Sequence, residues 1–250
     1  MKPKGIKSYK SNQEIDLDKS MYELLKNNPI PDEQLGENLG LFLNSKNFSR
    51  ILFMHHIYQK IVNIPGVIMD FGTRWGHNMA LFAIFRGIYE PFNRHRKIIG
   101  FDTFSGFPSV HEKDGSSDLM LAGNASTSKN YKEFLSKILD IHEMQNPLSH
   151  IKKNEICEGD ATQEIIKYLE RNPETIISLA YFDFDIYEPT KKCLKIIKDR
   201  VIKGSVIGFD ELNDHDSPGE TLALMEVFGL NNVMLKRLPI TSRTSYFIVD

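Results

Sequence analysis

Acidic side chains recur directly after short apolar runs in this 250-residue chain. The acids that follow such runs are Asp70, Asp102, Asp183 with Asp185, and Asp210 with Glu211, and a further run leads into Glu158-Gly159-Asp160. If the runs are parallel strands, their carboxyl ends meet at one edge of a sheet and the acids converge there. Converging carboxylates repel one another unless a cation or a donor-rich ligand lies among them. We therefore expect a ligand site at this edge, because helix capping explains one or two of these acids but not the adjacent pairs.

The loop after the first run reads Asp70-Phe71-Gly72-Thr73-Arg74-Trp75-Gly76-His77-Asn78. Gly72 and Gly76 permit a tight turn and a close approach of the backbone to a ligand. The dinucleotide pattern G-x-G-x-x-G is not met, because Arg74 and His77 stand where it needs glycine, and a Walker lysine is also missing. The spacing suits a small adenosyl ligand without a pyrophosphate, although a plain strand-to-helix turn would have a similar sequence.

Further candidates for cofactor binding follow the second and third runs. Asp102 can accept hydrogen bonds from both hydroxyls of a ribose, or it can belong to a surface turn. Asp160 can reach an adenine amine, or it can cap the helix expected after it. Trp75 and Phe104 either pack on the cofactor or belong to the ordinary core. The candidate cofactor-binding residues are Asp70, Gly72, Thr73, Trp75, Gly76, Asn78, Asp102, Thr103, Phe104, Asp160, Ala161 and Asp183.

The acids after the fourth and fifth runs indicate a metal site. Asp183 and Asp185 are two residues apart on an expected strand, so their side chains point to the same face. Asp210 and Glu211 end the neighbouring run. Oxygen donors from two adjacent strand ends suit Mg²⁺, which leaves other coordination positions to water or to substrate hydroxyls. No cluster of Cys and His favours zinc. The alternative is a hydrogen-bonded acidic cleft without a metal.

Strands that alternate with helices must position these acids. The pattern predicts strands near 67–71, 97–102, 155–157, 176–184 and 205–210, and helices near 48–62, 78–89, 131–142, 163–170, 189–203 and 220–228. Two β-prone segments, 233–238 and 244–249, flank Pro239 and predict a terminal hairpin. Such alternation is typical of a parallel sheet that helices cover on both faces. The prediction is an α/β, Rossmann-like domain at 48–250 with a mostly parallel seven-stranded sheet, preceded by a helical arm or lid at 1–47.

Composition and charge restrict the class of partner. The formal net charge is −2 and no long basic run occurs, so nucleic acid is not expected as a partner. No apolar stretch approaches the roughly 20 residues of a membrane span, and Met1 to Ser20 lacks the apolar core of a secretory signal. Cys157 and Cys193 lie in apolar segments and suggest buried free thiols rather than a disulfide. We expect a cytoplasmic protein.

Taken together, five segments resemble the macrocin O-methyltransferase family, whose members methylate hydroxyls on deoxysugars of macrolides, aminocoumarins and nucleotide-linked hexoses. The segments are 65–72 (PGVIMDFG), 101–108 (FDTFSGFP), 158–162 (EGDAT), 183–190 (DFDIYEPT) and 203–211 (KGSVIGFDE). Their order and spacing match from about residue 50 to the C-terminus, and the combination is more specific than any single segment. A closing hairpin on a parallel sheet also favours a methyltransferase over a dehydrogenase.

The resemblance implies a methyltransferase fold and transfer of a methyl group from S-adenosylmethionine to a sugar or sugar-nucleotide hydroxyl, with Mg²⁺ or another divalent cation as second cofactor. The implied metal ligands are Asp183, Asp210 and Glu211, and the implied general base is Asp185. The family's first loop usually begins with Glu where this chain has Asp70, and its terminal acid pair is often Asp-Asp. Glu211 therefore lengthens one ligand arm.

A sugar hydroxyl is hardly ionised at neutral pH, so the reaction needs a base besides the cation. His215, in the polar loop 213–218, is a second candidate base, although a solvated loop histidine is the ordinary alternative. The segments 1–40 and 109–130 could close over the sugar and set acceptor choice. The apolar face of the helix at 48–62 could serve a homo-oligomer. The rival functions are a nicotinamide-dependent sugar oxidoreductase or epimerase, a catechol methyltransferase, and a non-catalytic binding protein.

Overall fold

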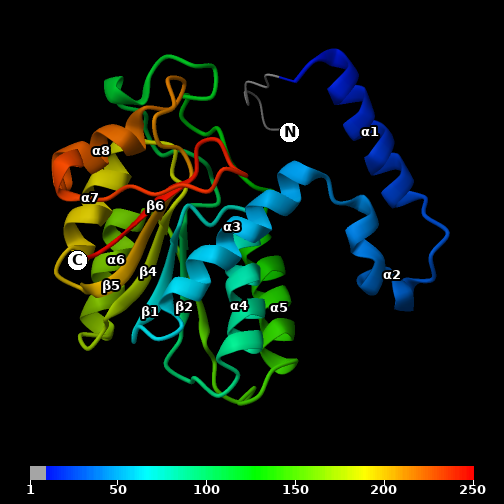
Figure 1. Cartoon of the computed structure of the whole chain (residues 1–250), viewed down its shortest axis with the longest axis horizontal. Helices are drawn as coiled ribbons and strands as arrows, with labels where there is room; N and C mark the ends of the chain where they lie inside the picture. The colour runs from blue at the N-terminus through cyan, green and yellow to red at the C-terminus, as the bar shows by residue number, and fades with distance from the viewer. Residues whose placement is uncertain (1–9) are drawn as a thin grey trace.

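A six-stranded sheet forms the centre of the computed structural model, which describes residues 10–250 (Figure 1). Its strands are β1 (Val67–Phe71), β2 (Ile98–Asp102), β3 (Asn154–Glu158), β4 (Ile177–Phe182), β5 (Val201–Phe209) and β6 (Ser245–Ile248). The strand order is β3-β2-β1-β4-β5-β6, and β6 pairs antiparallel with β5 whereas the other neighbours are parallel. The order reverses between β1 and β4, and an open parallel sheet binds ligands at such a switch point, beyond the carboxyl ends of its strands.

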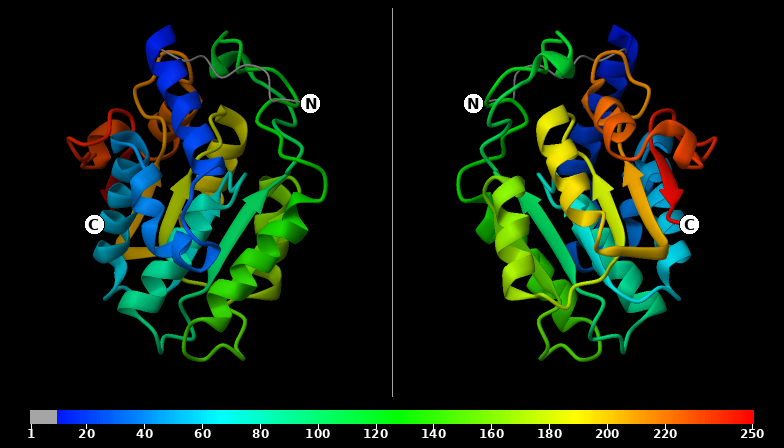
Figure 2. Two further views of the ribbon diagram at one scale, coloured as in Figure 1. Left: turned by 90° about the vertical axis from the view of Figure 1, so that its right-hand side faces the viewer. Right: turned by 90° about the vertical axis from the view of Figure 1, so that its left-hand side faces the viewer.

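Helices cover both faces of the sheet, as the two side views in Figure 2 show. One face carries α3 (Ser45–Ile61), α4 (His77–Tyr89) and α5 (Tyr131–Met144), and the other carries α6 (Ala161–Arg171), α7 (Tyr187–Ile197) and α8 (Gly219–Val227). Short 3-10 turns complete the body at η2 (Glu112–Asp114) and η3 (Leu230–Asn232). Every residue of β1 and of β4 is buried, as expected for parallel strands between two helical layers. The predicted α/β class is confirmed.

Phenylalanine rings form a row across the carboxyl ends of the strands. Phe71 of β1 stacks on Phe101 of β2 with ring centroids 4.9 Å apart and on Phe182 of β4 at 4.7 Å. Phe182 stacks in turn on Phe209 of β5 at 5.5 Å, and Phe209 lies 6.5 Å from Phe247 of β6. Phe71, Phe182 and Phe209 are the last residues of their strands, and Phe101 is followed only by Asp102 in β2. These four buried rings therefore lie directly below the polar loops that follow β1, β2, β4 and β5, whereas Phe247 belongs to the antiparallel β6 and extends the row sideways.

The predicted seventh strand at 233–238 is not confirmed within the described residues. Lys236 makes a single antiparallel bridge to Tyr246, with hydrogen bonds of 2.7 and 2.9 Å between their backbones. Only Val233 and Leu238 at the two ends of this segment pack against the core, and Met234 and Leu235 are exposed, so the segment has no continuous buried face that would hold a longer ladder in register. Pro239 follows directly and cannot donate a backbone hydrogen bond. The second half of the predicted hairpin does form, as β6.

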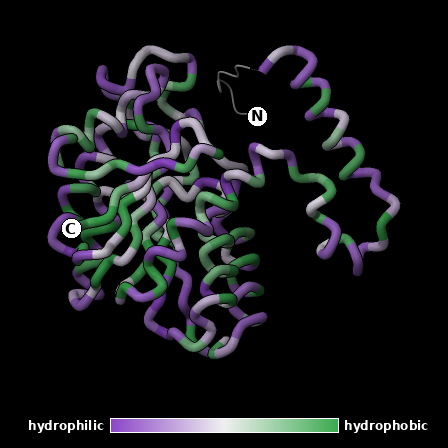
Figure 3. The backbone as a smooth tube through the Cα atoms, viewed as in Figure 1, coloured by the Kyte–Doolittle hydropathy of each residue, from purple (hydrophilic) through white to green (hydrophobic). Residues whose placement is uncertain are grey.

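The described part of the predicted N-terminal arm is helical. It contains α1 (Asn12–Lys26), α2 (Asp32–Asn38) and the 3-10 turn η1 (Leu39–Phe42), and residues 1–9 of the predicted arm lie outside the described residues. Ser11 and Glu14 form a capping box at the start of α1. None of these three elements has a buried residue, and α1 and α2 stand away from the body (Figure 1). Apolar residues are spread along the arm in Figure 3, and several of them, among them Leu17, Tyr22 and Leu24, have exposed side chains.

In the stretch from residue 10 onward, no helix is both long enough and apolar enough to cross a membrane. Cys157 and Cys193 are buried and free, as predicted from their apolar neighbours.

A buried ion-pair network joins α4, α5 and β3 on one face of the sheet. The Arg86 guanidinium donates to both carboxylate oxygens of Glu143, at 3.0 and 2.9 Å, and is 2 % exposed. Lys153 Nζ lies 2.5 Å from the same carboxylate, and Asn154 donates to it at 2.8 Å. Because Glu143 balances two desolvated cations, its charge is needed for the packing of this layer.

We expect Glu143→Gln to lower the free energy of unfolding by about 3–5 kcal/mol, because breaking a buried pair leaves an uncompensated charge. Asp16→Asn, which removes the partner of exposed Lys19, is the matched control and should leave stability within experimental error. Urea titrations followed by circular dichroism measure both. Equal stabilities of the two variants would contradict this assignment.

Candidate active site

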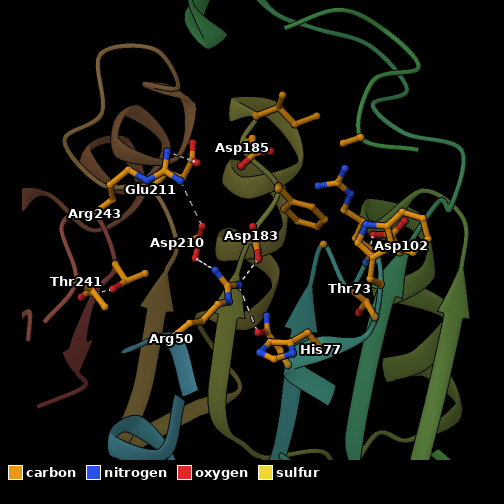
Figure 4. A pocket seen from close by; sticks show the side chains of 18 of the residues that line it. Arg50, Thr73, His77, Asp102, Asp183, Asp185, Asp210, Glu211, Thr241 and Arg243 are labelled. Carbon is orange, nitrogen blue, oxygen red and sulfur yellow. Dashed lines mark hydrogen bonds and ion pairs between the residues drawn. The ribbon is translucent and has the colours of Figure 1, made fainter. Parts of the chain in front are cut away.

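A cavity of about 1150 Å³ lies beyond the carboxyl ends of β1, β2, β4 and β5 (Figure 4). The predicted site residues that line it are Gly72, Thr73, Trp75, Asn78, Asp102, Thr103, Asp160, Ala161, Asp183, Asp185, Asp210 and Glu211. The start of α3, the loop after β2 and the segment 237–244 complete its wall. The fold therefore brings together acids from strands that are far apart in sequence.

The remaining predicted residues lie outside this lining. Asp70 is fully buried beneath the first loop, and Phe104 packs in the core cluster with Leu135. Gly76 begins α4 with a φ of 75°, where a Cβ would come within 2.2 Å of the Leu135 side chain. The prediction of His215 as a second base is not supported by the geometry, because its side chain is fully exposed to solvent away from the cavity.

The first loop is shaped by contacts with β4. Gly72 has a φ of 88°, and a Cβ on it would lie 2.0 Å from the carbonyl oxygen of Asp183. Only glycine fits so close to another backbone with this conformation. The tight turn brings the Arg74 amide to Asp102, to which it donates a hydrogen bond of 2.7 Å.

Asp102 connects the loops after β1 and β2. Besides the Arg74 amide, its carboxylate accepts a 2.6 Å hydrogen bond from the Phe104 amide. Burial raises the pKa of Asp102, and the two amide hydrogen bonds oppose that change. A carboxylate held in this way has a fixed orientation at the cavity wall and still has lone pairs for hydroxyl donors.

Asp70 and Asn78 form a buried pair at the floor of the first loop. Asn78 Nδ2 donates to Asp70 Oδ1 at 3.1 Å, and Asp70 Oδ2 has no hydrogen-bond partner among the described residues. Burial raises the pKa of Asp70 to about 6. An unsatisfied buried acceptor of this kind is costly unless a donor reaches it. Asn78 lines the cavity and therefore links Asp70 to the open space.

Asp160 caps α6 and also lines the cavity. Its carboxylate accepts from the amide of Thr162 at 2.9 Å and from the Thr162 hydroxyl at 2.8 Å. The helix-capping alternative is thus present in the structure. Because Gly159, Asp160 and Ala161 all line the cavity, capping does not remove this turn from the ligand site.

Arg50, on α3, lies between the acids that follow β4 and β5 (Figure 4). Its Nη2 donates to Asp183 Oδ2 at 2.6 Å, and its Nη1 donates to Asp210 Oδ1. The Tyr181 hydroxyl donates to the same oxygen of Asp210 at 2.9 Å. Burial and the neighbouring Asp210 raise the pKa of Asp183 to about 7, which Arg50 opposes. The guanidinium is the cation closest to this acid pair.

Arg243 neutralises the other side of the acid group. Its Nη1 lies 2.5 Å from Glu211 Oε1 and 3.0 Å from Asp214 Oδ2. Glu211 is 5 % exposed, and its Oε2 has no hydrogen-bond partner in the part of the chain that the structure describes. Burial raises the pKa of Glu211, and Arg243 opposes that change.

Glu220, at the start of α8, accepts hydrogen bonds from backbone amides of the loops that carry these acids. Its carboxylate accepts from the amides of Phe184 at 3.0 Å, Asp185 at 3.3 Å and Glu211 at 3.2 Å. Asp185 takes a φ of 61° and lines the cavity. Burial and the nearby Glu211 raise the pKa of Asp185 well above its ordinary value. Within residues 10–250, its carboxylate has no hydrogen-bond or ion-pair partner.

Sequence reasoning missed Arg50, Arg243 and Glu220. Arg50 occupies an ordinary polar position of the predicted helix at 48–62, and Arg243 lies in a polar loop. Neither has a local motif, since their partners are distant in sequence. The excess of strand-end acids was the only available signal, because it implies that cations must come from elsewhere in the chain or from solution.

The three acids of the predicted metal site form ion pairs with arginines in this structure. The described residues contain no group of three or more His, Cys, Asp or Glu side chains already gathered as metal ligands. Arg50 stands between Asp183 and Asp210 instead. The donor set nevertheless suits a divalent cation, because the acids supply hard oxygen ligands and Glu211 Oε2 is buried without a partner.

No protein-family model and no curated protein sequence matches the chain. Among solved structures, CalS11, described as a calicheamicin methyltransferase, is 39% identical with a TM-score of 0.94, over 96% of this chain and 94% of that chain. An apo structure of CalS11, described as a TDP-rhamnose 3'-O-methyltransferase of calicheamicin biosynthesis, is 37% identical with a TM-score of 0.85, over 96% of each chain. The O-methyltransferase NovP shares the fold at 16% identity and a TM-score of 0.57, over 80% of this chain and 79% of that chain.

The sheet order, the glycine loop and the match to CalS11 define an S-adenosylmethionine-dependent O-methyltransferase. The chain belongs to the deoxysugar O-methyltransferase family that contains CalS11, so the resemblance seen in its sequence segments is confirmed. This family assignment rules out the nicotinamide-dependent oxidoreductase and the non-catalytic binding protein as descriptions of the chain.

We expect Asp102→Ala to weaken binding of S-adenosylhomocysteine about tenfold to a hundredfold, because two ribose hydroxyls would lose a charged acceptor. Asp140→Ala, on the exposed surface of α5, is the control and should bind like the unaltered protein. Isothermal titration calorimetry measures both affinities. Unchanged binding by a folded Asp102→Ala protein would contradict the ribose assignment.

Proposed function

We propose that this enzyme transfers the methyl group of S-adenosylmethionine to a hydroxyl of a nucleotide-linked deoxysugar. The observation that carries the proposal is the 39% identity to CalS11 over 96% of the chain, since CalS11 is described as acting on TDP-rhamnose. The acid-rich cavity at the strand ends supports it, because sugar hydroxyls are hydrogen-bond donors that carboxylates accept well.

The cofactor would lie across the ends of β1, β2 and β3. Asp102 is oriented to accept the ribose hydroxyls, and the turn at Asp160 and Ala161 borders the space for the adenine. Buried Asp70 orients Asn78, whose side chain lines the cavity, and its negative charge beneath the loop suits the ammonium group at the methionine end. S-adenosylmethionine supplies an electrophilic methyl group, and the protein contributes placement and charge.

Asp185 is the proposed general base. Its carboxylate lines the cavity and has no partner among the described residues, so it is free to accept the proton of an acceptor hydroxyl. Burial among other acids raises its proton affinity, which suits a base that must take a proton from a weakly acidic group. Glu220 holds the amide of Asp185 and thereby positions it.

A divalent cation such as Mg²⁺ is proposed as the second cofactor, with Asp183, Asp210 and Glu211 as the residues that would hold it. When bound, such an ion lowers the pKa of a coordinated hydroxyl. The chain's own contribution is to concentrate acids there, since Asp183, Asp210 and Glu211 all come from the ends of two adjacent strands. Arg50 and Arg243 already compensate part of this charge.

The segments beside the cavity are proposed to select the acceptor. Leu43, Ser45 and Lys46, where the arm meets α3, line the cavity, and so do Leu119 and Ala125 from the insertion after β2. A sugar bound near Asp185 would be bordered by both segments. If the arm contributes in this way, residues 1–47 affect the choice among sugars more strongly than they affect the affinity for the cofactor.

Incubation with labelled S-adenosylmethionine and TDP-rhamnose should give a methylated sugar nucleotide in the presence of Mg²⁺. We expect EDTA to abolish turnover and added Mg²⁺ to restore it, because the hydroxyl would lose the charge that favours its ionisation. A catechol assayed in parallel tests the alternative acceptor class. Turnover of the catechol but not of any TDP-deoxysugar would contradict the proposal, and full turnover in EDTA would contradict its metal component.

Asp185→Asn should lower kcat about a hundredfold to ten-thousandfold, the range typical for loss of a general base. The change is isosteric, so binding of S-adenosylhomocysteine should be retained. Asp140→Asn, an exposed acid of α5, is the matched control and should keep full activity. An Asp185→Asn protein that binds the cofactor and turns over normally would exclude Asp185 as the base.

A further inference from the structure

Arg50 makes contacts that an ordinary surface arginine does not. It reaches from α3 to acids that follow two different strands, Asp183 at 2.6 Å and Asp210, and it also donates to Asn78 Oδ1 at 3.3 Å (Figure 4). Its side chain is 30% exposed, so one side of it still faces the cavity. A planar guanidinium with several donors is suited to bridging two carboxylates at once.

The acids around Arg50 are more numerous than the guanidinium groups that face them. The carboxylates at the ends of β4 and β5 and at the start of α8 are Asp183, Asp185, Asp210, Glu211 and Glu220. The ion pairs to this group come from Arg50 and Arg243, as far as the described residues show. Glu211 Oε2 is buried and without a partner, and it belongs to a side chain that lines the cavity. The group therefore retains both negative charge and an unused ligand atom.

We propose that Arg50 is an internal counter-ion that competes with the divalent cation for Asp183 and Asp210. The inference rests on the metal component of the proposed function. A cation held by these two acids and Glu211 needs carboxylate oxygens that Arg50 occupies in this structure, so binding requires the guanidinium to move away. While the metal is absent, the guanidinium neutralises the acid pair. The apparent metal affinity is the intrinsic affinity multiplied by the fraction of molecules in which Arg50 is displaced, so the competition weakens metal binding.

The position of Arg50 on α3 makes such a displacement feasible without unfolding. The helix is capped at Asn44, whose side chain accepts from the Asn47 amide at 2.8 Å, and it is anchored by buried residues from Phe53 onward. The side chain can therefore leave the acids by rotating toward the open cavity, while the part of α3 from Phe53 onward stays anchored in the core. The first turns of α3, before Phe53, have no fully buried side chain. Partly buried Ile51 packs against the core, and Arg50 supplies the ion pairs that link these turns to the acids at the strand ends.

Titration with Mn²⁺, followed by electron paramagnetic resonance of the free ion, tests the competition directly. Arg50→Met should bind Mn²⁺ about tenfold or more tightly than the unaltered protein, because no guanidinium has to leave first. Arg50→Lys keeps the charge but cannot bridge both acids, and its affinity should fall between the two. Arg171→Met, which removes an exposed pair with Glu155, is the control and should bind like the unaltered protein. Equal or weaker Mn²⁺ binding by Arg50→Met, or no binding by either protein, would overturn the inference.

Hydrogen exchange on the unaltered protein is a second test, which does not require Arg50→Met to fold. Saturation with Mn²⁺ should speed exchange at the amides of 46–51, since the link from α3 to the acids is lost, whereas unchanged or slower exchange would contradict the displacement. Methyl transfer to TDP-rhamnose is measured on the same samples. Normal turnover without any effect of Arg50→Met on Mn²⁺ binding refutes only the competition. Competition without turnover of any sugar refutes the proposed function instead.

Discussion

The burial of several carboxylates at the ends of β4 and β5 is the constraint on which this structure depends. Such groups lose hydration and repel one another, so they persist only with compensating cations or donors. Arg50 and Arg243 provide part of that compensation, and Glu220 accepts three backbone amides that hold the loops beneath them. The arrangement is thus costly for folding and suited to binding ligands that carry positive charge or hydroxyl groups.

The sheet explains why these groups meet. The reversal of strand order between β1 and β4 separates two halves, with Asp102, the proposed ribose acceptor, on one side and Asp183 and Asp210 on the other. The stacked phenylalanine row ends the strands at a common level and excludes water below the loops. Gly72 then lets the first loop touch the backbone of Asp183, so the two halves are in direct contact where a methyl donor and an acceptor would meet.

Much of this could be predicted from the sequence because it is encoded locally. Alternating apolar runs predicted the strands, and the acids after them predicted the site edge, since parallel strands place their carboxyl ends together. Arg50 could not be predicted, because its position in a helix carries no sign of partners more than a hundred residues away. The seventh strand is not confirmed, because in the segment 233–238 only Val233 and Leu238 pack against the core and the residues between them are exposed. The position of His215 outside the cavity lining could not be predicted either, because loop composition does not tell where a side chain points.

A crystal structure with S-adenosylhomocysteine, TDP-rhamnose and Mg²⁺ tests the central claim most directly, which is that these acids surround the reacting hydroxyl. We predict an acceptor hydroxyl within hydrogen-bond distance of Asp185 and facing the sulfur of the bound cofactor product. We also predict the metal on Asp183, Asp210 and Glu211, with Arg50 turned away from them. A sugar bound far from the strand ends, with Arg50 still bridging Asp183 and Asp210, would contradict the account.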